Sequence, residues 1–148
     1  MSKARLAEQT FRDGGNCAQA VLTAFCPDCG LEPETATRAA QALGGGIAGT
    51  GRVCGALTGA VIAIGLARGS NVCGDKEAKA DTNALVRELL ERFTRAHGDT
   101  ACRTLIGLDL TDPAQAARAY RGSEYTERCA AFVNLAADLT EELLAEPD

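Results

Sequence analysis

Hydrophobic side chains recur every three or four positions along most of the chain, which is the spacing of amphipathic α-helices. The two longest stripes lie in residues 75–97 and in the segment after Ser123, and they carry Leu85, Leu89, Leu90 and Phe93, and then Cys129, Phe132, Val133, Ala136 and Leu139 or Thr140. Gly98 is the expected stop of the first of these helices and Ser123 the expected cap of the second. No run of alternating β-branched residues predicts a strand. The pattern is that of an all-α protein.

Start and stop signals divide the rest of the chain into shorter helices. Asn16 is expected to cap a helix that begins at Cys17 and that Pro27 ends. The other expected segments are a first short helix ended by 13–15, a helix from Pro33 to Leu43, a helix that begins near Arg52, a short turn over 102–106 capped by Thr100, and a weak helix over 113–120. With short connections and no repeat or linker, residues 1–148 are predicted to form one compact helical bundle of six to eight helices.

Composition narrows the function classes. The chain has 148 residues, 46% of them hydrophobic and 24% charged, which suits one folded domain and excludes wholesale disorder. Its net charge of −5, with no Lys/Arg cluster, argues against nucleic-acid binding. The 15 uncharged residues between Arg52 and Arg68 are too few to cross a bilayer, so they predict a core helix and no membrane span. With no apolar leader at the N-terminus, a cytoplasmic location is expected.

Small residues recur every fourth position in this predicted core helix: Gly51, Gly55, Gly59, Ala63 and Ala67. Because each glycine inside a helix costs about 1 kcal/mol relative to alanine, the stripe needs a packing or site reason. Close packing of another helix is one interpretation. A second interpretation is that the glycines leave room for a cofactor beside Cys54. A third is that the stripe forms the contact between two copies of the chain in a homodimer.

Cysteine is unusually frequent, with seven in the chain. In a reducing compartment, thiols that cluster in space are more often metal ligands or redox groups than disulfides. Cys17, Cys54 and Cys102 each fall at the start of a predicted helix, where backbone amides and the helix dipole stabilise a thiolate. Cys129 lies on the apolar face of the last helix. The alternative is that all four are small hydrophobic residues of the core.

The remaining chemical motifs are weaker. Cys26 and Cys29 form a C-x-x-C at a helix end, interpreted as a solvent-facing turn, with an accessory dithiol as the alternative. Cys73 is expected in a loop, and His97 at the surface as a partner of a helix C-terminus. The G-x-G-x-x-G letters of 44–49 follow a predicted helix and lack the strand that a dinucleotide-binding turn requires.

Four separated motifs resemble one known family. They are Asn16-Cys17-Ala18-Gln19-Ala20-Val21, Val53-Cys54-Gly55-Ala56-Leu57-Thr58-Gly59-Ala60, Cys102-Arg103-x-Leu105-Ile106-Gly107-x-Asp109, and Cys129 in the final helix. From about residue 10 to about residue 140 the chain is similar to the C_GCAxxG_C_C family of redox-active proteins. The resemblance implies that the functional thiols are Cys17, Cys54, Cys102 and Cys129, with no established substrate. Cys26, Cys29 and Cys73 lie outside that pattern.

Three functional hypotheses follow. The first is an iron–sulfur cluster bound by Cys17, Cys54, Cys102 and Cys129, with Gly55 and Gly59 leaving it space, for electron transfer with a redox partner or for redox sensing. Zinc would also accept four cysteines, although its ligands usually come as close C-x-x-C pairs. The second is a metal-free thiol–disulfide protein. The third is a helical binding module whose cysteines only fill the core.

Overall fold

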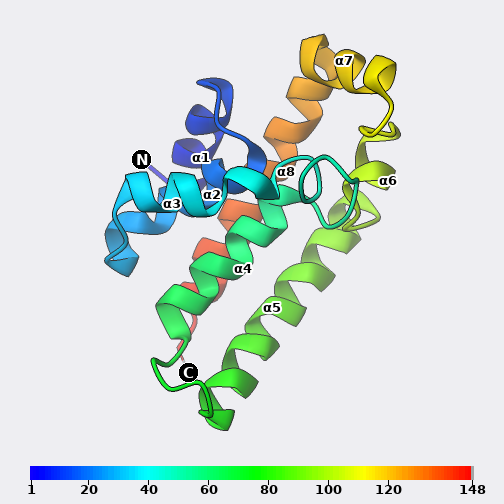
Figure 1. Cartoon of the computed structure of the whole chain (residues 1–148). Coiled ribbons are helices and arrows are strands. Elements are labelled where there is room, and N and C mark those ends of the chain that lie inside the picture. Colours follow the sequence, from blue (N-terminus) through cyan, green and yellow to red (C-terminus); the bar gives the residue numbers. More distant parts are fainter. Residues whose placement is uncertain (148) are drawn as a thin grey trace.

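The computed structural model describes residues 1–147, and this part of the chain forms eight α-helices (Figure 1). They are α1 (Lys3–Arg12), α2 (Cys17–Cys29), α3 (Pro33–Ala39), α4 (Gly55–Arg68), α5 (Lys76–His97), α6 (Cys102–Ile106), α7 (Pro113–Arg121) and α8 (Ser123–Ala145), with a 3₁₀ turn, η1 (Gln41–Leu43), after α3. The predicted all-α, single-domain class and the predicted number of helices are confirmed.

The start of α2 is built as predicted. The Asn16 side chain accepts a hydrogen bond of 2.8 Å from the Gln19 backbone N–H, and the Gln19 side chain accepts one from Asn16 N–H, which completes a capping box. The expected stop at Pro27 is wrong, because α2 continues to Cys29. Proline removes one backbone donor, but Phe25 and Cys26 are buried and hold this turn in place. Gly30, with φ +66°, ends the helix instead.

Four other expected boundaries differ. The α4 helix begins at Gly55 and not near Arg52, because Val53 forms an isolated antiparallel bridge with Ala101. For the same reason Ala101, not Thr100, precedes α6. Gly122, not Ser123, occupies the cap position of α8. The helix from Pro33 ends at Ala39 and only the 3₁₀ turn continues to Leu43. The ends of α5 at Asp75 and Gly98 agree with the prediction.

The core forms where α2, α4 and α8 meet, with α1 against α2 and α8, and α5 against α4 and α8. Figure 1 shows α6 and α7 at the end of the bundle where α4 begins and α5 ends. The α4 helix lies in this core as predicted, with Leu57 and Ile64 fully buried. None of the helices in residues 1–147 combines the length and the apolar character that a membrane span requires.

The glycine stripe serves contacts within the chain. A Cβ on Gly59 would lie 2.6 Å from the carbonyl oxygen of Ala18, and a Cβ on Gly55 would lie 3.2 Å from the Cys17 Cβ. Both glycines therefore allow the backbones of α2 and α4 to approach closely, as the packing interpretation expects. Because α2 covers Gly55 and Gly59, these two glycines are not free to meet a second copy. Gly51, expected in the same helix, lies before α4 and faces Arg103. The homodimer stays a prediction.

Candidate functional site

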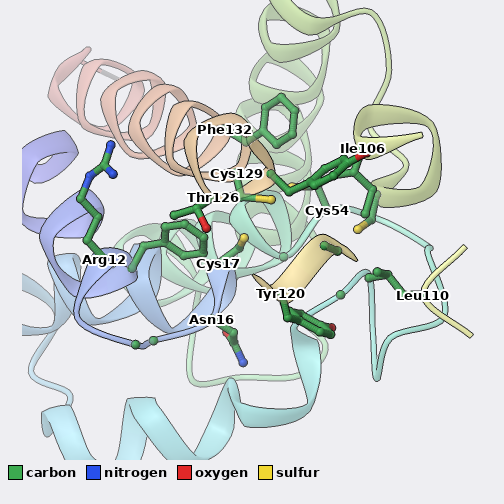
Figure 2. A pocket seen from close by; sticks show the side chains of 18 residues that line it. Arg12, Asn16, Cys17, Cys54, Ile106, Leu110, Tyr120, Thr126, Cys129 and Phe132 are labelled. Atoms are coloured by element: carbon green, nitrogen blue, oxygen red, sulfur yellow. The ribbon is translucent and has the colours of Figure 1, made fainter. Parts of the chain in front are cut away.

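Four of the seven cysteines line one cavity of about 440 Å³. Cys17 is the first residue of α2, Cys54 precedes α4, Cys102 is the first residue of α6, and Cys129 lies in α8. Cys54 and Cys102 are buried, and Cys17 and Cys129 are partly exposed. Figure 2 shows this cavity with Cys17 and Cys129 pointing toward each other. The structure thus brings together the four cysteines that the sequence analysis selected.

The bridge between Val53 and Ala101 places two of these cysteines. The Cys54 backbone N–H donates a hydrogen bond of 2.8 Å to the Thr100 carbonyl, and the Cys102 backbone N–H donates one of 2.7 Å to the Arg52 carbonyl. Successive residues of an extended segment point to opposite faces, and each cysteine follows its bridge residue by one position. Both thiols therefore leave the bridge on the same side, toward the cavity.

A left-handed loop packs behind Cys102. Five consecutive residues, 45–49, have positive φ, including Ile47 at +68° and Ala48 at +53°. A side chain at Gly46 would place its Cβ 2.7 Å from the Cys102 Cβ and 2.6 Å from the Arg52 nitrogen, so only glycine fits there. The loop joins η1 to the Val53 bridge and contains no strand–helix turn, which agrees with the rejection of a dinucleotide motif.

Gly55 and Gly59 have different positions relative to the cavity. Gly55 is one of its lining residues, next to Cys17 and Cys54. Gly59 lies one turn further along α4, against the Ala18 backbone, and is not among the lining residues. Gly59 therefore affects the site indirectly: it allows α2 to pack closely against α4, and Cys17 is the first residue of α2.

Cys17 and Cys129 interact directly. The Cys17 thiol donates a hydrogen bond to the Cys129 sulfur, which raises the pKa of Cys17 well above its usual value and lowers the pKa of Cys129. Burial raises the pKa of Cys17 further, and the positive charge of Arg128 lowers that of Cys129. Arg128 also donates to the Ile106 carbonyl over 3.3 Å, which ties the end of α6 to α8 beside Cys129. Cys129 is therefore the preferred thiolate of this pair.

The other two thiols are held in their neutral form by their surroundings. Burial raises the pKa of Cys54 to about 12, although the backbone N–H groups of Ala56 and Leu57 act in the opposite direction. Burial also raises the pKa of Cys102 to about 11, and a negative charge on Cys129 adds to this. The expected thiolate stabilisation at helix starts is present at Cys54, but loss of hydration outweighs it. The expectation is wrong for Cys17, whose pKa the hydrogen bond to Cys129 and burial raise, and for Cys102, whose pKa burial raises.

Aromatic and apolar side chains complete the cavity wall: Phe11, Ile106, Leu110, Tyr120, Tyr125 and Phe132. Tyr120, near the end of α7, lines the cavity although it is 70% exposed, and burial and the cavity thiols raise its pKa. Arg12 also lines the cavity and pairs with Glu127 (2.8 Å) and Glu8 (2.9 Å). Phe11, Arg12 and Tyr120 could not be assigned to the site from the sequence, because nothing in the spacing of α1 and α7 relates them to the cysteines.

The other candidates lie elsewhere. Cys73 is exposed in the loop before α5, as expected. Cys26 and Cys29 occupy the last turn of α2, but the expected solvent-facing turn is wrong for Cys26, which is buried because this turn packs against the core. His97 is the last residue of α5 as predicted, but it is partly buried. Its ring centroid lies 4.8 Å from that of Phe132 and 5.1 Å from that of Phe93, and burial lowers its pKa. His97 thus packs against Phe132, one of the residues that line the cavity.

The arrangement of the thiols differs from a single-ion site. Within residues 1–147, no set of three or more His, Cys, Asp or Glu side chains converges as the ligands of one metal ion would. A tetrahedral zinc ion with Zn–S bonds of about 2.3 Å would hold its ligand sulfurs about 3.8 Å apart. The four thiols share a cavity, but as placed they do not surround one point.

Comparison with known proteins agrees with the residues of the site. No curated protein and no solved structure matched the chain. The family model described as "Putative redox-active protein (C_GCAxxG_C_C)" matches residues 15–143, which include all four cysteines of the cavity. This match covers most of the chain, and the chain therefore belongs to the C_GCAxxG_C_C family.

Proposed function

We propose that the four-cysteine cavity is a redox centre that holds an iron–sulfur cluster for electron transfer or redox sensing. One observation carries the proposal: the four cysteines of the family pattern, and none of the other three, line a single cavity. They come from four segments that are distant in the sequence, and the fold brings them to one cavity. Four thiolates from distant parts of a chain are a ligand set that such clusters accept.

The chemistry of the thiols fits such a group. Burial disfavours a negative charge on Cys17, Cys54 and Cys102, so a bound cation that replaces their protons would relieve an electrostatic cost. Within residues 1–147 the thiols do not converge as the ligands of one metal ion would, so the proposal rests on their shared cavity and on the residues that line it. When bound, the cluster would supply one-electron chemistry.

The protein's own residues would set the properties of the centre. The N–H groups of Ala56 and Leu57 face the Cys54 sulfur and stabilise negative charge on it. Phe11 and Phe132 line the cavity with apolar surface, and hydrogen bonds and burial around the sulfurs are what tune the potential of such a centre. Tyr120 lies at the exposed side, where a redox partner would approach.

The experiment is anaerobic purification followed by visible absorption and by analysis for iron, sulfide and zinc. We expect broad visible absorption with iron and sulfide in the wild type, lost in Cys54→Ser and retained in Cys73→Ser. Cys73 is the matched control, because it is an exposed cysteine outside the cavity. A colourless protein after anaerobic reconstitution, or equal iron in both variants, would overturn the cluster. Zinc in place of iron would assign a structural metal instead.

A metal-free dithiol is the second candidate, and the contact between Cys17 and Cys129 favours it. A thiolate on Cys129 beside a neutral Cys17 thiol is the arrangement from which a disulfide forms when a disulfide oxidant accepts the two electrons. Thiol titration of the metal-free protein before and after oxidation tests it. Loss of two thiols that requires both Cys17 and Cys129 would support this candidate. Unchanged thiol counts would exclude it, and a helical module with core cysteines would remain.

A reducing compartment suits either form of the site. Both candidates need their thiols free, and the seven cysteines of the chain are free in the structure. We therefore propose a cytoplasmic protein that exchanges electrons with a redox partner.

A further inference from the structure

Two cysteines outside the cavity occupy the last turn of α2. Cys26 is 2% exposed and Cys29 is partly exposed, and both pack against the core. At 1.5 Å of rise per residue, Cys26 lies about 14 Å and Cys29 about 18 Å along the helix from Cys17. Direct exchange between this pair and the four-cysteine cavity is therefore excluded, and chemistry at Cys26 and Cys29 would be independent of the redox centre proposed above.

Helix geometry places the two residues within reach of a disulfide bond. Residues three apart in an α-helix have Cα atoms about 5 Å apart and share one face. Disulfides need a Cα separation of about 4.4 to 6.8 Å. Side chains of a helix lean toward its N-terminus, so the Cys29 side chain leans toward the turn that holds Cys26. Cys26 now donates a weak hydrogen bond of 3.5 Å to the Leu22 carbonyl, and rotation of its side chain would give up only that bond.

The surroundings give the two thiols different roles. Cys29 is accessible, whereas Cys26 is covered. Lys3 from α1 pairs with Asp28 over 2.5 Å and lies 5.7 Å from the Phe25 ring centre, so a positive charge sits over this turn. Burial and Asp28 raise the pKa of Cys29, and Lys3 opposes them. Cys29 is thus the thiol that meets an external oxidant, and Cys26 is placed to react second.

We propose that Cys26 and Cys29 form a redox dithiol separate from the four-cysteine cavity, which small-molecule disulfides oxidise to an intrahelical disulfide. The Cys29 thiolate attacks one sulfur of the small disulfide, which forms a mixed disulfide and releases one small thiol. The Cys26 thiolate then attacks the Cys29 sulfur and releases the second small thiol. The protein loses two hydrogens and gains one S–S bond, and the small disulfide is reduced to two thiols.

The test uses the full-length protein as purified, exposed to excess oxidised glutathione and then treated with an alkylating agent. Digestion by trypsin together with a protease that cuts before aspartate separates 13–27, with Cys17 and Cys26, from 28–38, with Cys29 alone. We expect these two peptides to be joined, at a mass two hydrogens below their sum. Fragment ions that break 13–27 between its two cysteines should place the bond at Cys26.

Two controls make the outcome decisive. Peptide 69–74 contains the single exposed Cys73 and should carry glutathione, which shows that the oxidant reached the protein. Cys29→Ser should abolish the joined peptides, and so should Cys26→Ala, which keeps a small apolar side chain in the core. Alkylated Cys26 and Cys29, glutathione on Cys29 without a bond to Cys26, or a bond from Cys29 to Cys17 would each overturn the proposal. None of these results depends on whether the four-cysteine cavity holds a cluster.

Discussion

Replacement of Gly59 by alanine tests whether the close contact between α2 and α4 holds the cavity in shape. The new Cβ would lie 2.6 Å from the Ala18 carbonyl oxygen and 3.1 Å from the Ala18 Cα. These are backbone atoms, so the helices themselves must separate. Gly65 offers a matched control in the same helix, because a Cβ there meets no atom within 4 Å. Both substitutions change the same residue type in α4 and differ only in what the methyl group meets.

The expected magnitude follows from two opposing effects. Alanine in place of glycine gains about 1 kcal/mol of helix stability at either position. Only Gly59→Ala also forces apart a packed interface, and overpacking of this kind costs about 1 to 3 kcal/mol. Because the obstacle is backbone, we take the upper part of that range. Gly59→Ala should therefore be about 1 to 2 kcal/mol less stable than the wild type, and Gly65→Ala up to about 1 kcal/mol more stable.

Urea denaturation of the three proteins measures these differences as shifts of the midpoint at constant slope. Iron content after anaerobic purification provides a second measurement, because Ala18 directly follows Cys17 and a displaced α2 would move that thiol. We expect Gly59→Ala to hold less iron than Gly65→Ala. Equal stability of the two variants would refute the packing argument, since the helix-propensity gain is common to both.

Three further substitutions test other parts of the site. Asn16→Ala should lower stability by about 1 to 2 kcal/mol in urea denaturation, because the α2 cap is lost together with the amide donation to the Gln41 carbonyl at 3.0 Å; a change below the experimental error would contradict this. In the metal-free protein, Cys17→Ala should move the midpoint of Cys129 alkylation to higher pH, because the hydrogen bond that lowers the Cys129 pKa is removed. Mass spectrometry of samples alkylated at a series of pH values measures this midpoint, and an unchanged midpoint would be inconsistent with the contact. Burial lowers the pKa of His97, so its contribution to stability is present above the unfolded pKa of about 6.5 and is lost as pH falls through the folded pKa; the urea midpoint should fall over that window in the wild type and stay level in His97→Gln.

Local signals in the sequence predicted most of the helices. Asn16 as a cap, Gly98 as a stop and the apolar stripe of α5 each act through hydrogen bonds or burial within a few residues, and each is confirmed. The errors arose where a distant segment decides the conformation. Val53 is extended because Ala101 pairs with it, and α2 continues past Pro27 because the core holds Phe25 and Cys26 in place.

The same distinction explains what could be known of the site. The four cysteines stood out because three of them begin helices, and helix starts are visible in the sequence. Their shared cavity, however, depends on a single bridge between Val53 and Ala101, which turns Cys54 and Cys102 to one side. A bridge of one residue pair has no periodic pattern in the sequence from which it could be predicted. The preference of Cys129 for the thiolate form likewise depends on a neighbour that is distant in the chain. Sequence reasoning can therefore select candidate ligands, whereas the protonation of each thiol, and with it the choice between cluster and dithiol, is decided by tertiary contacts.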